Sequence, residues 1–378
     1  MKCRAPVWRE AVGIAGRASV LLSCIPVAAC DTAGREMPAA ALVAFADARE
    51  TDRSGDTMLI DMETFGRAFE IRRRLVLEET DQAMTVLPMV SVGALGEFLL
   101  AEPQEGQVNV YDTAGRLLRV VGRRGEGPGE FRAPISARKT LDGGIMVAEV
   151  MLSRLTLYPP WGSGEPEVLA SPLPLVVGAQ DLGGSRYLLS GQVMTDRQPH
   201  LLHIWDREAD EVERSFMPIG VPEESRPYAA SYTSVDAVPE GDTIWAVWAL
   251  SDTLYKFDRD GGVLERFPLS LPRPMGVLPG AEAGVITDPR ARQAAAESLT
   301  QVNSVFLLGD DALVVQTMQA RGFDAVWDLI IVDRQGARLW GAARMPRLFA
   351  VAGDLFYFSD PASLFPNHWI VARWRGDG

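Results

Sequence analysis

Histidine is scarce in this sequence, and its few positions give little support to a metal site or a hydrolase. His200 and His203 form an H-x-x-H pattern, and His368 stands alone. Positions i and i+3 of a strand face opposite sides, and two or three histidines without thiolates do not make a zinc site. A Ser-His-Asp hydrolase would need a G-x-S-x-G nucleophile elbow, which the sequence lacks. We therefore expect the histidines to be solvated or to lie at sheet edges.

The enzymatic alternative is a metal-dependent hydrolase, lactonase or lyase with its site in a central channel, and its most specific form is a calcium-dependent lactonase. Such a site would need Glu, Asn and Asp side chains that converge from several strands. The chain contains three asparagines, of which only Asn303 falls near a predicted inner strand. The acidic candidates Glu97, Asp181 and Asp236 fall in or near predicted turns. The sequence therefore favours a protein without a metal or other cofactor, and a metal-dependent enzyme is kept as the alternative.

A glycine-rich run at 122–129 could suggest a phosphate-binding loop. It lacks the terminal Gly-Lys-Ser/Thr of such loops, and a strand signal from Phe131 onward follows it instead of a helix. Glycines also serve where a chain must turn sharply. We therefore interpret this run as a turn that carries the chain from one strand unit to the next.

The elements that would position these residues are short strands in a repeating order. The segments 96–102 (GEFLLAE) and 143–149 (GGIMVAE) share an Ala-Glu pair, and Tyr111 and Tyr158 recur at the same offset of 47 residues. Six units of turn plus strand begin near residues 86, 132, 174, 231, 301 and 345. A blade of this kind buries its faces only against neighbouring blades, so the array should close into a ring. The sequence predicts an all-β fold, a six-bladed β-propeller.

A ring needs one terminus to complete the blade of the other. The best candidate is 69–77 (FEIRRRLVL), which we expect to pair with the sheet that ends in WIVARW.

One insertion interrupts the repeat between 270 and 302. Within it, Asp288 followed by Pro289 and an Ala-rich run predicts a short helix. We expect this insertion to cover part of the channel mouth, with an ornament on the rim as the alternative.

Loops that lead into the inner strands of a propeller crowd the mouth of its central channel. Four candidate ligand-binding residues occupy such positions: Arg132, Tyr232, Gln301 and Arg347. The two arginines could hold a carboxylate or a sugar acid bidentately, or they could pair with the surrounding carboxylates. The leading hypothesis is a non-catalytic recognition or scaffold propeller that binds a protein, a peptide or a glycan.

The N-terminus has the pattern of an exported lipoprotein. A positively charged start precedes a compact apolar stretch at 18–29, which is too short to span a bilayer. It ends in Val-Ala-Ala before Cys30, a bacterial lipobox pattern that predicts lipidation of Cys30. Ordinary secretion with Cys30 as a chance residue, and a cytoplasmic start misread as a signal, are the alternatives. We predict a signal peptide at 1–29, a tether at 30–55 and the propeller at 56–378, held in the cell envelope by the lipid alone.

Composition and charge limit the partners further. Hydrophobic residues make up 47% of the chain and charged residues 23%, which suits a large folded core. The formal net charge of −13 repels nucleic acid and anionic membrane surfaces. We therefore expect no nucleic-acid partner, and we expect a monomer.

Residues 110–134 (VYDTAGRLLRVVGRRGEGPGEFRAP) carry a specific resemblance. They resemble the junction between blades in NHL-like six-bladed β-propeller lipoproteins of Bacteroidetes- and Gemmatimonadetes-type bacteria, with its hallmark GxGPGEF. Residues 49–57 (RETDRSGDT) also resemble the segment before the first strand of that family. The sequence departs from the family in a weak Gly-Glu-Pro remnant at 164–166 and in the long insertion. The resemblance implies the fold and an envelope location, and it implies no reaction.

Overall fold

The computed structural model describes residues 60–80, 89–93, 95–160, 164–192, 199–229, 234–280, 288–321, 324–363 and 365–376. The predicted signal peptide, the lipidation site Cys30, the tether and Tyr232 lie outside these ranges. Among the helices described, none is long and apolar enough to cross a membrane.

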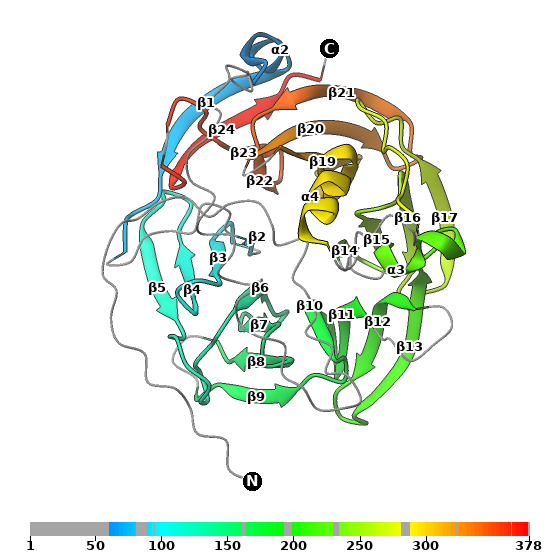
Figure 1. Cartoon of the computed structure of the whole chain (residues 1–378). Coiled ribbons are helices and arrows are strands. Elements are labelled where there is room, and N and C mark those ends of the chain that lie inside the picture. The colour runs from blue at the N-terminus through cyan, green and yellow to red at the C-terminus, as the bar shows by residue number, and fades with distance from the viewer. Residues whose placement is uncertain are drawn as a thin grey trace.

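The strands form six four-stranded antiparallel sheets, arranged around a common centre as the blades of a propeller (Figure 1). From the innermost strand outward, blades 1 to 3 are β2 (Met89–Val92), β3 (Phe98–Glu102), β4 (Gln107–Tyr111), β5 (Leu117–Val121); β6 (Pro134–Lys139), β7 (Ile145–Glu149), β8 (Arg154–Tyr158), β9 (Glu167–Ala170); and β10 (Leu175–Gly183), β11 (Arg186–Gln192), β12 (His200–Asp206), β13 (Glu211–Pro218). Blades 4 to 6 are β14 (Val235–Glu240), β15 (Thr243–Trp248), β16 (Thr253–Asp258), β17 (Val263–Pro268); β18 (Thr300–Leu308), β19 (Ala312–Arg321), β20 (Asp324–Asp333), β21 (Arg338–Met345); and β22 (Leu348–Ala352), β23 (Leu355–Ser359), β24 (His368–Trp374), β1 (Phe69–Val76).

This architecture confirms the predicted six-bladed β-propeller. Each innermost strand begins within four residues of a predicted unit start. The strands of a blade alternate in direction, and the chain passes from the outermost strand of one blade to the innermost strand of the next. Every innermost strand therefore begins on the same side of the ring. We call this side the top face; Pro134, Thr300 and Leu348 mark it.

The second strand of a blade, here β3, shows why the sequence has continuous apolar runs at these positions. All five residues of β3 are buried, because both faces of the sheet are covered. Leu99 and Ala101 pack in the cluster shared with blade 2, while Phe98 and Leu100 pack in the cluster shared with blade 6. Burial of each large side chain contributes roughly 1.5–3 kcal/mol. Alternate residues of one strand thus join two neighbouring blades.

The ring closes through β1, as the sequence predicts. This strand pairs antiparallel with β24, from Phe69 opposite Trp374 to Val76 opposite His368. The N-terminal part of the described chain therefore supplies the outermost strand of the C-terminal blade (Figure 1). Blade 6 cannot form without both ends of the chain.

A helix that the sequence pattern did not predict, α2 (Met62–Ala68), precedes the closing strand. Asp61 caps it by accepting a hydrogen bond from the Thr64 N–H at 2.9 Å. The Phe65 ring of this helix stacks on Phe69 at 5.1 Å. Seven residues are too few to show helical periodicity, so this helix could not be recognised from the residue pattern.

The glycine-rich run behaves as the predicted turn. The Glu130 carboxylate accepts hydrogen bonds from the N–H groups of Glu126 (3.1 Å) and Gly127 (2.9 Å). These N–H groups hold the pKa of Glu130 below its usual range, with help from Arg123. A side chain at Gly125 would collide with the same carboxylate. Donors that a phosphate loop would offer to a ligand are used here by the protein's own glutamate.

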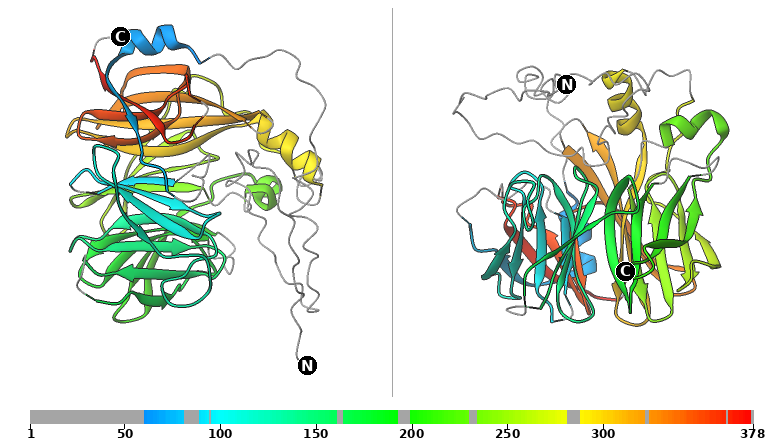
Figure 2. Two further views of the ribbon diagram at one scale, coloured as in Figure 1. Left: turned by 90° about the vertical axis from the view of Figure 1, so that its left-hand side faces the viewer. Right: turned by 90° about the horizontal axis from the view of Figure 1, so that it is seen from below.

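Two helical segments stand on the top face (Figure 2). One is α4 (Pro289–Ser298), the helix predicted in the insertion; its N-cap Asp288 accepts a hydrogen bond from the Arg290 N–H at 2.9 Å. The other, η2 (Glu223–Ser225) with α3 (Arg226–Ala229), was not predicted. Figure 1 shows α4 close to the centre of the ring.

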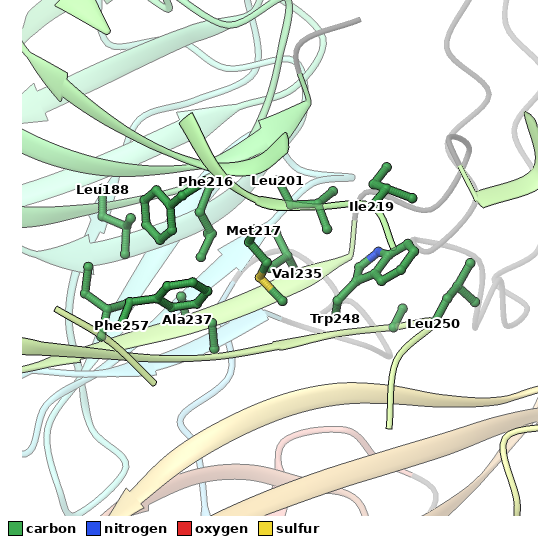
Figure 3. Packing of buried hydrophobic residues seen from close by; sticks show 14 of the residues in the cluster. Leu188, Leu201, Phe216, Met217, Ile219, Val235, Ala237, Trp248, Leu250 and Phe257 are labelled. Atoms are coloured by element: carbon green, nitrogen blue, oxygen red, sulfur yellow. The ribbon is translucent and has the colours of Figure 1, made fainter. Parts of the chain in front are cut away.

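A large apolar cluster between blades 3 and 4 supports these segments (Figure 3). Ile219, Trp248 and Leu250 extend the cluster toward the top face, where Tyr228 of α3 and Leu299 after α4 join it. The insertion is therefore part of the packed molecule.

Polar contacts fix the insertion to blade 5. Arg273 binds Asp328 through two hydrogen bonds of 2.7 and 2.9 Å, and it donates a third to Gln319 at 2.8 Å. Gln319 in turn donates to the Glu297 carbonyl at 2.8 Å. The strands of this hairpin, β19 and β20, have ten residues each, against five to seven in the second and third strands of the other blades. Insertion and hairpin together form one wall on the top face.

Candidate functional site

A cavity of about 370 Å³ occupies the centre of the ring, and residues from the innermost strands of all six blades line it. Its lining is mainly apolar, with a few neutral polar side chains: Ser91, Ser136, Gln180, Ser190, Ser234, Asn303 and Ser304. The charged lining residues are Arg138, Asp236 and Arg347. A concave, largely apolar site with a few polar groups is the usual form of a small-ligand pocket.

Arg138 and Asp236 form an ion pair across the inner strands of blades 2 and 4. The guanidinium Nη2 lies 3.5 Å from Asp236 Oδ1, and Oδ2 accepts a hydrogen bond from the Val305 N–H at 3.0 Å. The carboxyl side chain keeps 24% of its surface exposed inside the cavity. Burial raises the pKa of Asp236, and Arg138 opposes that shift. The pair thus places one carboxylate beside one cation in the wall.

Arg347 precedes β22 and lies between two aromatic rings. Its guanidinium carbon is 5.2 Å from the centre of the Trp327 ring and 5.0 Å from that of Phe349. All three residues line the cavity. Burial lowers the pKa of Arg347 to about 10, so the group is still cationic at neutral pH. Cation–π contacts with both rings hold the guanidinium at the top of the cavity.

The structure places the predicted site residues in different surroundings. Arg347 lines the cavity, as the channel-mouth hypothesis expected. Arg132 points to solvent, with its guanidinium 3.2 Å from Glu126, and it is not among the lining residues. Gln301 is 2% exposed within β18 and does not line the cavity either. The structure therefore brings neither Arg132 nor Gln301 together with Arg347 in this cavity.

Sequence reasoning missed Arg138 and Trp327, and it considered Asp236 only as a candidate metal ligand. Arg138 could have been found from alternation, because Ser136 and Arg138 lie two residues apart on β6 and both line the cavity. Asp236 falls within β14, whereas the sequence suggested a position in or near a turn. Trp327 belongs to the long hairpin of blade 5, and its position over Arg347 depends on how two blades meet.

The other acidic candidates join neighbouring blades. Glu97 pairs with Lys139 at 3.0 Å, and Asp181 accepts a hydrogen bond from the Leu141 N–H at 2.9 Å. Within the ranges that the structure describes, no three His, Cys, Asp or Glu side chains are grouped so that they could hold a metal ion.

One histidine differs from expectation. His203 is fully buried in β12, and its Nδ1 lies 2.8 Å from Ser215 Oγ. The expectation of a solvated or edge position was wrong, because β12 is an interior strand whose residues 201–205 are all buried. Burial lowers the pKa of His203 from 6.5 to about 4, so the ring is neutral at pH 7.

Comparison with known proteins supports the fold. No protein-family model matches the chain, and no curated protein matches it. A protein described as exported, from Bacteroides fragilis NCTC 9343, superposes with a TM-score of 0.61 at 11% identity, over 82% of this chain and 95% of that chain. A member of the DUF4221 family from Bacteroides vulgatus gives 0.60 at 11% identity, over 81% and 97%. This likeness shows the six-bladed propeller alone, and the NHL-like family stays a prediction.

Proposed function

We propose that this protein is an exported, non-catalytic recognition propeller that binds a ligand or partner through the top face and the central cavity. The observation that carries the proposal is Arg347, a half-buried cation that contacts the rings of Trp327 and Phe349 in the wall of the cavity. A group that is held rigidly before binding loses little conformational freedom on binding.

Three further features support recognition. The cavity volume of about 370 Å³ falls in the range of small-ligand sites, about 300–1,000 Å³. Its polar groups come from several blades, so they can set the orientation of a ligand. The wall of insertion and hairpin raises one side of the top face, and loops that exceed structural need often carry function.

The location in the cell envelope rests on the N-terminal sequence. The lipobox pattern before Cys30 supports export and attachment by a lipid. A structural neighbour that is described as exported agrees with this proposal.

Photocrosslinking in the native envelope tests the proposal. A benzophenone amino acid replaces Ser234, which lines the cavity at the top face, and a matched control places it at Val263, which is 48% exposed on the outermost strand β17. We expect a discrete adduct from position 234 that position 263 does not give. Adducts of equal yield at both positions, or turnover of a lactone with calcium that Asp236→Asn abolishes, would contradict the proposal.

A further inference from the structure

The charge inside the cavity is opposite in sign to that of the molecule. The lining contains two guanidinium groups, Arg138 and Arg347, and one carboxylate, Asp236, so its formal balance is +1. The whole chain carries −13. Charges in a confined site of low dielectric act more strongly than the same charges in water. The cavity therefore favours a ligand with a negative group, although the chain as a whole is negatively charged.

The guanidinium chemistry of Arg347 narrows the type of anion. A guanidinium has its N–H groups in its own plane, so it recognises an anion through its edge. That edge matches the two oxygens of a carboxylate, which it binds through two parallel hydrogen bonds. Trp327 and Phe349, which lie next to this guanidinium and line the cavity, give the neighbouring part of a ligand an apolar surface.

Asp236 limits the charge that the cavity can accept. Its carboxylate also lines the cavity, where it is already paired with Arg138 at 3.5 Å. Asp236 would repel a dianionic phosphate more strongly than a monocarboxylate, because the phosphate carries two negative charges instead of one. Apolar lining residues such as Ile135, Val177 and Phe306 favour an apolar body over a second charge.

We propose that the central cavity binds a small monocarboxylate with an apolar or aromatic body, whose carboxylate pairs with Arg347 at the top of the cavity. This inference rests on the proposed function and specifies the ligand class of the same site. Asp236 then acts as the group that excludes dianions, and Arg138 neutralises Asp236 in the empty site.

Binding of carboxylates and their neutral amides to the full chain provides the test. Tryptophan is replaced by 5-fluorotryptophan, and the ¹⁹F signal of Trp327 is assigned with Trp327→Phe. The probes are benzoate with benzamide, phenylacetate with phenylacetamide, and hexanoate with hexanamide. We expect the carboxylates to shift the Trp327 signal in a saturable manner and to bind at least about tenfold more tightly than the amides.

Arg347→Gln should weaken carboxylate binding at least about tenfold, and the exposed control Arg132→Gln should not change it.

A second variant covers the case in which Arg347→Gln does not fold. Asp236→Asn removes the negative charge from the wall, so carboxylate binding should become several-fold tighter. Amides that bind as tightly as carboxylates, a panel in which no carboxylate binds, or unchanged carboxylate affinity in Asp236→Asn would each overturn the inference. The crosslinking at Ser234 tests the proposed function independently, so the two can fail separately.

Discussion

Burial of His203 makes the stability of the fold depend on pH. It has no exposed surface, and its neutral ring lies beside Ser215 Oγ. Burial lowers the pKa from 6.5 to about 4, so the unfolded chain takes up a proton on this histidine at a higher pH than the folded chain does. Its stabilising contribution is therefore complete above pH 6.5 and decreases as the pH falls toward 4.

This shift predicts a measurable difference in acid stability. Between pH 7 and pH 4 the free energy of unfolding should lose up to about 3 kcal/mol through His203. His203→Gln, which cannot titrate, should lack that part of the loss, while His368→Gln should keep it. Urea unfolding at half-unit steps of pH measures the three curves. If the parent and His203→Gln curves run parallel, His203 does not titrate in this range.

Glu149 explains why the predicted arginine at residue 132 does not reach the cavity. The buried Glu149 carboxylate accepts hydrogen bonds from the N–H groups of Arg132 (2.5 Å) and Ala133 (3.2 Å). It also binds the Arg154 guanidinium at 3.0 Å. These contacts fix the backbone just before β6, and the Arg132 side chain points outward to Glu126.

At the scale of elements, Arg273 connects the insertion to blade 5. Asp328 has no exposed surface, and its main cationic contact is the bidentate pair with Arg273. It also accepts the Arg344 N–H at 3.0 Å. Removal of one member of a buried ion pair typically costs about 3–5 kcal/mol, because the other charge is left uncompensated.

We expect Arg273→Met to destabilise the protein by about 3–5 kcal/mol and to accelerate hydrogen exchange in α4 and in the β19–β20 hairpin. The control Arg290→Met changes an exposed side chain on α4 and should stay within about 0.5 kcal/mol of the parent. Calorimetry with exchange mass spectrometry measures both effects. Unchanged exchange in α4 would mean that apolar packing alone holds the insertion.

The elements differ in how far the sequence predicted them. The inner strands and β1 were predictable because turns and apolar runs recur, and α4 because Asp288 and Pro289 mark a helix start. The short helices α2 and α3 lack such periodicity. Of the cavity residues, Arg347 was predictable from its place before an inner strand. Its two aromatic neighbours were not, because Trp327 comes from another blade.

At the scale of the whole molecule, the ring depends on β1. Its Phe69 is 1% exposed and contacts the rings of Phe356 and Phe358 at 5.1 and 5.2 Å. Each blade buries its faces against two neighbours, so a loosened closing strand exposes apolar surface on both sides of the junction. Destabilisation at this position should therefore spread beyond blade 6.

Phe69→Ala should destabilise the protein by about 3–5 kcal/mol, as the truncation of a buried phenylalanine typically does. Arg72→Ala changes an exposed residue of the same strand and should stay within about 0.5 kcal/mol. Because closure couples the blades, the amides of the largely buried strands β3, β7 and β15 should exchange faster together with those of β24. Native-state hydrogen exchange measures this directly. Faster exchange restricted to β1 and β24 would show that the other blades keep their stability without closure of the ring.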